Sequence, residues 1–148
     1  IKNILLWRPS DITKVERVTE KEGNWIILIK AATNVLKGDN FVFVYPELLE
    51  NQTIVSRGEV ITSQILEKKN SDFLNIKSTV NNLLKKTRDK IKSRGSIVNE
   101  ITTKGDFRKK INDSIEVNLK NKYLIEVVSL KDSKTAESII VELNVTQL

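Results

Sequence analysis

The stretch that decides the fold runs from Trp25 to Ile61 and has the sequence WIILIKAATNVLKGDNFVFVYPELLENQTIVSRGEVI. It is the part of the chain richest in β-branched and aromatic residues, which favour strands. Residues 25–30 are apolar at almost every position, and this predicts a strand covered on both faces. Residues 41–45 predict a second strand, antiparallel to the first, which Pro46 is expected to end because proline lacks an N–H group. We expect this stretch to form the core.

The end of the same stretch predicts two more strands, at residues 52–56 and 59–66. Arg57-Gly58 lies between them, and a two-residue link with glycine in second place is typical of a tight hairpin. Ile54 and Val55 are expected to pack inward from the first of these strands.

Apolar residues elsewhere in the chain recur either at alternate positions or at steps of three and four. We therefore expect strands at residues 4–7, 123–130 and 138–145, a helix that begins at Ser10 and stops before Gly23, and helices at residues 73–94 and 107–119. The apolar stripe of the second helix consists of Phe73, Ile76, Val80, Leu83, Leu84, Thr87 and Ile91, and that of the third of Phe107, Ile111, Ile115 and Leu119. Trp7 and Trp25 are expected in the core.

A chain of 148 residues most simply forms one domain. The pattern predicts an α+β domain over residues 1–148, with a mixed, largely antiparallel sheet and about three helices packed on it. Its β-rich part is residues 1–66 and its helix-rich part residues 67–148, and they are joined in one domain because neither alone has a complete set of core residues. The sequence contains no Met, so we expect it to be a fragment of a longer chain.

Cysteine and histidine are absent, which excludes disulfides, thiolate chemistry, and the usual general base and metal ligand. The spacings of calcium, phosphate-binding and dinucleotide-binding loops are absent too. The sequence therefore predicts a protein that is not an enzyme and has no cofactor, metal or small-molecule substrate. The alternative is a hydrolase without histidine, whose Ser/Lys or paired-carboxylate site is assembled in space.

Positive charge is concentrated between Lys85 and Lys110, where ten basic and three acidic side chains give a net charge of +7 in a chain of +6. Such a segment attracts phosphate groups of nucleic acid, anionic lipids and acidic polymers. The same charges are typical of the solvent-exposed face of two helices, and no aromatic residue between Phe73 and Phe107 offers base stacking. The candidate residues for binding an anion or a partner are Lys85, Lys86, Arg88, Lys92, Arg94, Arg108, Lys109 and Lys110.

Residues 9–66 also carry a resemblance to a known family. The features in question are a short helix ending in Lys21-Glu22-Gly23, the run from Trp25 to Asp39, the strand from Phe41 to Val44 and the run from Asn51 to Ile61. In order and spacing they resemble the C-terminal domain of a bacterial membrane-protein family, domain of unknown function 3084. Residues 123–148 resemble the closing pair of strands of that family more weakly.

The resemblance implies a cellular context and no activity. Members of that family have N-terminal membrane segments and a long coiled coil before this domain. That would place the domain in the bacterial cell envelope, on the extracytoplasmic face of the cytoplasmic membrane. We expect a non-enzymatic interaction or scaffold module that binds a protein partner or associates with itself. The alternative is a sequence-independent anion-binding domain that docks nucleic acid, anionic polymer or lipid on its basic helices.

Overall fold

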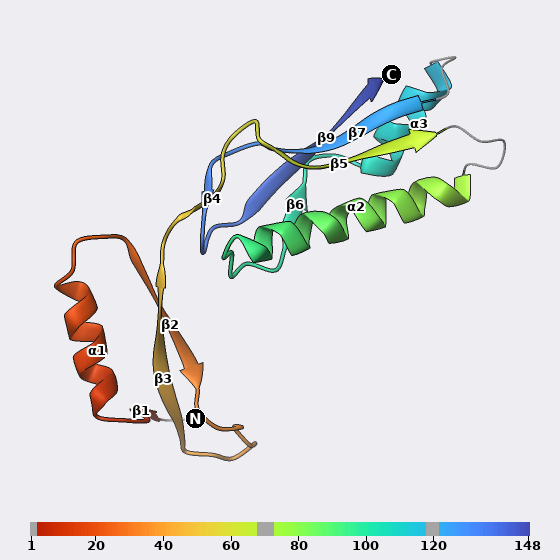
Figure 1. Cartoon of the computed structure of the whole chain (residues 1–148). Helices are drawn as coiled ribbons and strands as arrows, with labels where there is room; N and C mark the ends of the chain where they lie inside the picture. Colours follow the sequence, from red (N-terminus) through yellow and green to blue (C-terminus); the bar gives the residue numbers. More distant parts are fainter. Residues whose placement is uncertain (1–2, 68–72, 118–121) are drawn as a thin grey trace. The chain divides into compact units, whose positions relative to one another are not determined.

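The computed structural model describes residues 3–67, 73–117 and 122–148 (Figure 1). Within these ranges it has three helices and mixed, largely antiparallel sheets, which confirms the predicted α+β class. Contacts divide the chain into two compact units, residues 1–52 (the N-terminal unit) and residues 53–148 (the C-terminal unit). The division falls between Gln52 and Thr53, earlier than the expected one after residue 66, and the single domain stays a prediction.

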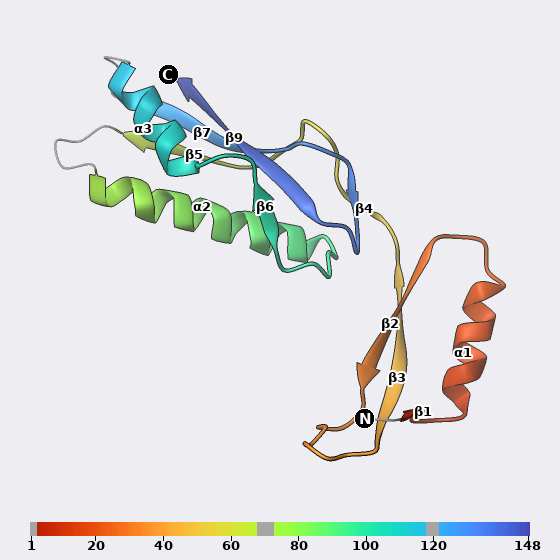
Figure 2. The same cartoon turned by 180° about the vertical axis from the view of Figure 1, so that it is seen from behind.

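The N-terminal unit is a three-stranded sheet with one helix. Its elements are β1 (Asn3–Leu6), α1 (Ser10–Thr19), β2 (Trp25–Ala31) and β3 (Phe41–Glu50). Strand β3 lies in the middle, parallel to β1 and antiparallel to β2, and the second pairing confirms the prediction. In both views α1 stands beside β3 (Figure 1, Figure 2).

Strand β3 continues through Pro46 to its last residue, so the expected end of pairing at Pro46 is wrong. The N–H of Ala32 donates to the carbonyl oxygen of Phe43 at 2.8 Å, directly after the end of β2. Hydrogen-bonded and non-bonded pairs alternate along antiparallel strands. Ala32 and Phe43 are thus a hydrogen-bonded pair, and Ile29 and Pro46, three pairs further along the strands, are a non-bonded pair. The missing N–H of proline is therefore not needed by β2.

The C-terminal unit holds two sheets and two helices. Its elements are β4 (Thr53–Val55), β5 (Val60–Glu67), α2 (Phe73–Ser93), β6 (Ile101–Thr103), α3 (Phe107–Val117), β7 (Lys122–Ser129), β8 (Ser133–Lys134) and β9 (Ile139–Gln147). The larger sheet has the order β5-β7-β9-β6, and β4 pairs with β8 in a small second sheet. Because β5 pairs with β7, a division after residue 66 would cut through the larger sheet.

Both strands predicted after β3 exist, but the predicted hairpin between them is wrong. Strand β4 pairs with β8, and β5 pairs with β7. The turn at Arg57-Gly58 is present, with Gly58 at a φ of 80°. Its backbone bonds to the end of β7, since the N–H of Gly58 donates to the carbonyl of Ser129 at 2.8 Å and the N–H of Ser129 to that of Glu59 at 2.9 Å. The turn thus carries the chain from one sheet to the other.

The core cluster lies in the C-terminal unit, where α2 packs on β5, α3 packs on β9, and the two helices contact each other. The predicted stripes are confirmed at the positions that the structure describes: Ile76, Val80, Leu83, Thr87 and Ile91 are buried on α2, Leu84 is half-buried, and Phe107, Ile111 and Ile115 are buried on α3. The side chain of Phe73 and residue Leu119 lie outside the described residues. Gly95, at a φ of 97°, ends α2 as predicted.

The core is therefore not the Trp25–Ile61 stretch as a whole. Ile54 and Val55 are buried as predicted and belong to the core cluster. In the described part of the N-terminal unit, only Val42, Val44 and Pro46 are buried apolar side chains. Every position of β2 is exposed or half-buried, so the prediction that it is covered on both faces is wrong. The physical reason is that one ten-residue helix cannot cover both faces of a three-stranded sheet.

Candidate functional site

The most unusual surface of the molecule is the apolar surface of the N-terminal unit. Among the described residues, fourteen large hydrophobic side chains are exposed, and eleven of them belong to this unit of residues 1–52. We call these eleven the apolar surface; they are Ile4, Leu5, Leu6, Trp7, Ile12, Trp25, Ile27, Ile29, Val35, Leu36 and Phe41. The larger C-terminal unit exposes three, Val60, Ile65 and Leu148.

The register shows how the strands carry this surface. Ile29 lies opposite Pro46 in the pairing of β2 with β3, and Ile4 lies opposite Val42 in the pairing of β1 with β3. Side chains alternate between the two faces of a sheet, so these residues and Ile27 share one face. The helix contributes little cover, because its own Ile12 is 50% exposed. Apolar side chains are thus left exposed on this face of the sheet. Both edge strands, β1 and β2, consist mostly of apolar residues as well.

Aromatic side chains gather on the opposite face of the same sheet. The ring of Phe43 meets those of Trp7 and Phe41 edge to face, with centroids 5.5 Å and 5.4 Å apart. Trp7 and Phe41 remain about half exposed, at 49% and 50%, and line a hollow of about 280 Å³. Trp7 and Trp25, the latter 38% exposed, are therefore surface residues, and the prediction that they lie in the core is wrong.

The predicted basic site is carried by two helices of the C-terminal unit. Four of its residues, Lys85, Lys86, Arg88 and Lys92, are exposed on α2 away from its buried stripe. Three more, Arg108, Lys109 and Lys110, are exposed in the first turn of α3. None of these seven side chains forms an ion pair with another described residue. They are available to an external anion.

The first turn of α3 is an unfavourable place for positive charge, because the positive end of the helix dipole lies there. The turn contains no acidic residue. Its backbone is capped by Asp106, whose carboxylate accepts the N–H groups of Arg108 at 2.9 Å and Lys109 at 3.2 Å. The three cations therefore do not stabilise the helix. An interaction with a molecule outside the chain would explain why positive charge lies there.

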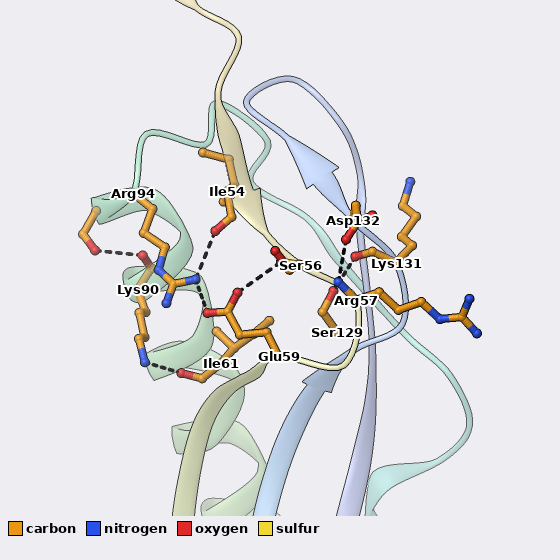
Figure 3. Close-up of polar contacts among 11 residues, drawn as sticks. Ile54, Ser56, Arg57, Glu59, Ile61, Lys90, Arg94, Ser129, Lys131 and Asp132 are labelled. Carbon is orange, nitrogen blue, oxygen red and sulfur yellow. Dashed lines mark hydrogen bonds and ion pairs between the residues drawn. The ribbon is translucent and has the colours of Figure 1, made fainter.

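Arg94, the eighth candidate, is used inside the fold (Figure 3). Its Nη1 donates to the carbonyl oxygen of Ile54 at 3.0 Å and lies 2.6 Å from Oε1 of Glu59. The side chains of Arg94 and Glu59 are 32% and 30% exposed. The geometry thus assigns Arg94 to the joint between the end of α2 and the turn before β5, apart from the seven exposed cations.

Two further contacts complete this joint (Figure 3). The Nζ of Lys90 donates to the carbonyl of Ile61 at 2.6 Å, and Oε2 of Glu59 accepts the N–H of Ser56 at 3.1 Å. Burial works to raise the pKa of Glu59, but the Ser56 N–H and the Arg94 guanidinium outweigh it and lower that pKa below its usual value. The carboxylate is therefore held ionised as a structural partner.

A groove of about 470 Å³ lies beside α1 and β3 and was not predicted from the sequence. Lys14 and Arg17 of α1 and Lys21 beyond its end line it together with Tyr45 of β3, and Glu47 is the one acidic residue among the described residues of the lining. Its positive lining suits an anionic group. The charge count along the sequence offered no sign of it, because acidic residues are interleaved with the basic ones between residues 8 and 22.

Within the ranges described, no group of three or more acidic side chains is placed to hold a metal ion. No helix in those ranges combines the length and apolar character needed to cross a membrane. Comparison with protein-family models, with curated proteins and with solved structures found no match. The family resemblance of residues 9–66 stays a prediction, and the function is argued from the surfaces alone.

Proposed function

We propose that this chain is a non-enzymatic interaction module whose working surface is the apolar surface of the N-terminal unit. The observation that supports this most is the uneven distribution of exposed hydrophobic side chains, eleven in residues 1–52 against three in residues 53–148. Exposed hydrophobic side chains that share one face, as Ile4, Ile27 and Ile29 do, typically mark the binding site of another macromolecule. The proposed occupant is protein, either a second copy of the chain or another polypeptide.

The energetics favour association through this surface. Fully burying a large aliphatic or aromatic side chain is worth about 1.5–3 kcal/mol. Association costs about 4–15 kcal/mol in lost translational and rotational freedom. Ile27, Ile29 and Trp25 are 38–54% exposed, so covering each of them gains about half of that amount. With a few of their neighbours the gain reaches the lower end of the cost of association. The C-terminal unit, with its own core cluster, gains less from a partner because its hydrophobic side chains are already buried.

The cellular context is a separate part of the proposal and rests on the family resemblance. By that resemblance, the module stands at the end of a membrane-anchored coiled coil, on the extracytoplasmic face of the bacterial cytoplasmic membrane. An interaction module suits the end of a coiled coil, because such a position presents it at a distance from the membrane.

A matched pair of substitutions tests the proposed surface. Ile29 and Ile65 both lie in strands and are 54% and 57% exposed, but only Ile29 belongs to the apolar surface. We expect sedimentation velocity to show association of the wild-type chain with rising concentration. Ile29→Lys should reduce it, whereas Ile65→Lys should leave it unchanged. Equal loss with both variants, or a chain that is monomeric throughout and binds no apolar fluorescent dye, would contradict the proposal.

Anion binding through the basic helices is the second candidate. It is favoured by the three exposed cations in the first turn of α3, where they do not stabilise the helix. The test is binding of the full chain to duplex DNA and to an acidic polymer at several salt concentrations. Binding should weaken steeply with salt and disappear when Lys85, Lys86, Arg88 and Lys92 are changed to Glu. No binding at low salt would end this candidate.

A further inference from the structure

Strand β2 forms an open edge of the N-terminal sheet, because the order of that sheet is β1-β3-β2. Ala32 and Phe43 make a hydrogen-bonded pair, and so do Asn24 and Asn51 at the other end, where the N–H of Asn51 donates to Asn24 at 2.8 Å. Pairs alternate in antiparallel strands, so the even-numbered residues of β2 bond to β3. The N–H and C=O groups of its odd-numbered residues point to the open edge.

The residues whose backbone groups point outward are Trp25, Ile27, Ile29 and Ala31. The side chains of the first three are among the exposed apolar ones. A flat, apolar strand edge with unpaired backbone groups is a template for pairing with another strand. Edge strands usually prevent this with a charge, a proline or a bulge. Strand β2 contains no proline, its pairing with β3 is regular, and its single charged residue is Lys30.

Lys30 does not prevent edge pairing. Its ammonium group forms an ion pair with Glu47 of β3, and the hydrogen bond to Glu47 raises the pKa of Lys30. Glu47 pairs with Leu28 in the register, so the ion pair lies on the side of β2 that faces β3. The outer edge of β2 is thus left without a charge of its own.

We propose that two copies of this chain dimerise by antiparallel pairing of β2 with β2 of the second copy, which joins the two three-stranded sheets into one. A twofold axis at Leu28 brings all seven residues of each strand into register. Ile27 then lies opposite the second Ile29, and Trp25 lies opposite the second Ala31. These are the residues with outward backbone groups, so each pair exchanges two backbone hydrogen bonds.

The second copy fits this edge better than an unrelated peptide does, because the strand is complementary to itself. In the register centred on Leu28, the large ring of Trp25 meets the small side chain of Ala31. Lys30 of one copy lies opposite Ile26 of the other copy, and not opposite its Lys30, so like charges do not face each other. A twofold interface requires self-complementarity of this kind.

This inference rests on the proposed function, since it names the occupant of part of the apolar surface. The chain has no native cysteine, so single cysteines report on the register. At the twofold axis, Leu28 faces its copy in a non-bonded pair with Cα atoms about 4.5 Å apart, within the range of about 4.4–6.8 Å for a disulfide. The two copies of Ile26 would be four residues apart along the strand, or about 13 Å.

The experiment is oxidation of the full chain carrying Leu28→Cys, with Ile26→Cys as the matched control. Both side chains are half-buried and share one face of β2. We expect a disulfide-linked dimer from Leu28→Cys and none from Ile26→Cys. The double variant Ile26→Cys/Lys30→Cys should restore the dimer, because position 26 of each copy then faces position 30 of the other. The double variant also tests the register if Leu28→Cys does not fold.

The outcomes separate this inference from the proposed function. If the wild-type chain associates in sedimentation and Ile29→Lys weakens that association, but neither Leu28→Cys nor the double variant cross-links, edge pairing through β2 is overturned and the apolar surface stands as the interaction surface. Cross-linking of Ile26→Cys to the same extent as Leu28→Cys also overturns the register. A wild-type chain that does not associate but binds an apolar fluorescent dye overturns edge pairing alone, whereas one that neither associates nor binds the dye overturns both proposals.

Discussion

Nη1 of Arg94 lies 2.6 Å from Oε1 of Glu59 and also donates to the carbonyl oxygen of Ile54 at 3.0 Å. One side chain from the end of α2 thus holds both the start of the C-terminal unit and the turn before β5. We expect Arg94→Ala to lower the free energy of unfolding by about 2 kcal/mol, because it removes a hydrogen bond to a charged group and leaves Glu59 without its cation. Denaturant unfolding of the full chain measures this.

Lys92→Ala is the control for that substitution. Lys92 lies on the same helix two residues earlier, is exposed, and belongs to the seven side chains without an ion pair among the described residues. Its removal should change the free energy of unfolding by no more than about 0.5 kcal/mol. If Arg94→Ala behaved in the same way, Arg94 would return to the set of cations available for anion binding.

The lowered pKa of Glu59 predicts a pH dependence of stability. A carboxyl group with a lower pKa in the folded than in the unfolded state stabilises the fold above its unfolded pKa of about 4.3. That stabilisation is lost as the pH falls through the folded pKa. Glu59→Gln should therefore lower stability near neutral pH by about 1 kcal/mol, since the pair is partly exposed. The difference from wild type should shrink below about pH 4.

Urea unfolding of both proteins across this pH range is the measurement. A constant difference between wild type and Glu59→Gln at all pH values would show that the charge of Glu59 is not what stabilises the joint. The substitution would then act through packing alone.

The alternation of backbone bonds along β2 predicts different effects of proline at neighbouring positions. The N–H of Leu28 bonds to β3, whereas that of Ile29 points to the open edge. We expect Leu28→Pro to cost the N-terminal unit about 1–3 kcal/mol more than Ile29→Pro, because it breaks a bond within the sheet. Hydrogen exchange of β3 amides reports the stability of that sheet. A smaller cost at position 28 than at position 29 would contradict the assigned alternation.

The helices and the strands β7 and β9 were predictable from sequence, because their patterns are local. The stripe from Ile76 to Ile91 repeats at helical spacing, and alternate residues of β9 such as Val141 and Leu143 are buried. Burial on one face imposes these periods, whatever the partner element is. Fold class and most element positions therefore follow from the residues alone.

The pairing of β4 and β5 was not predictable, because the partners lie far away in the chain. Arg57-Gly58 has the composition of a hairpin turn, and nothing near it shows that its backbone bonds to Ser129. The role of Arg94 was hidden for the same reason, since Glu59 and Ile54 lie far from it in sequence. Local sequence patterns indicate which residues form strands and which are cationic. They do not indicate the distant strand or side chain with which each of them pairs.

The exposure of β2 was mispredicted for a different reason. An apolar strand such as Trp25–Ala31 has the same composition whether its own chain or a partner covers it. Sequence alone thus placed in the core what the structure leaves on the surface. That error locates the candidate interaction surface, because strongly apolar residues without cover within the chain are the ones that a partner would bury.

Amide hydrogen exchange of the full chain at low and at high protein concentration tests the central claim most directly. If the apolar surface is the interaction surface, exchange should slow with concentration in residues 3–50, most of all in β2. It should not change at the basic residues of α2 and α3. Protection confined to those two helices, or no change anywhere while the chain associates, would contradict the account.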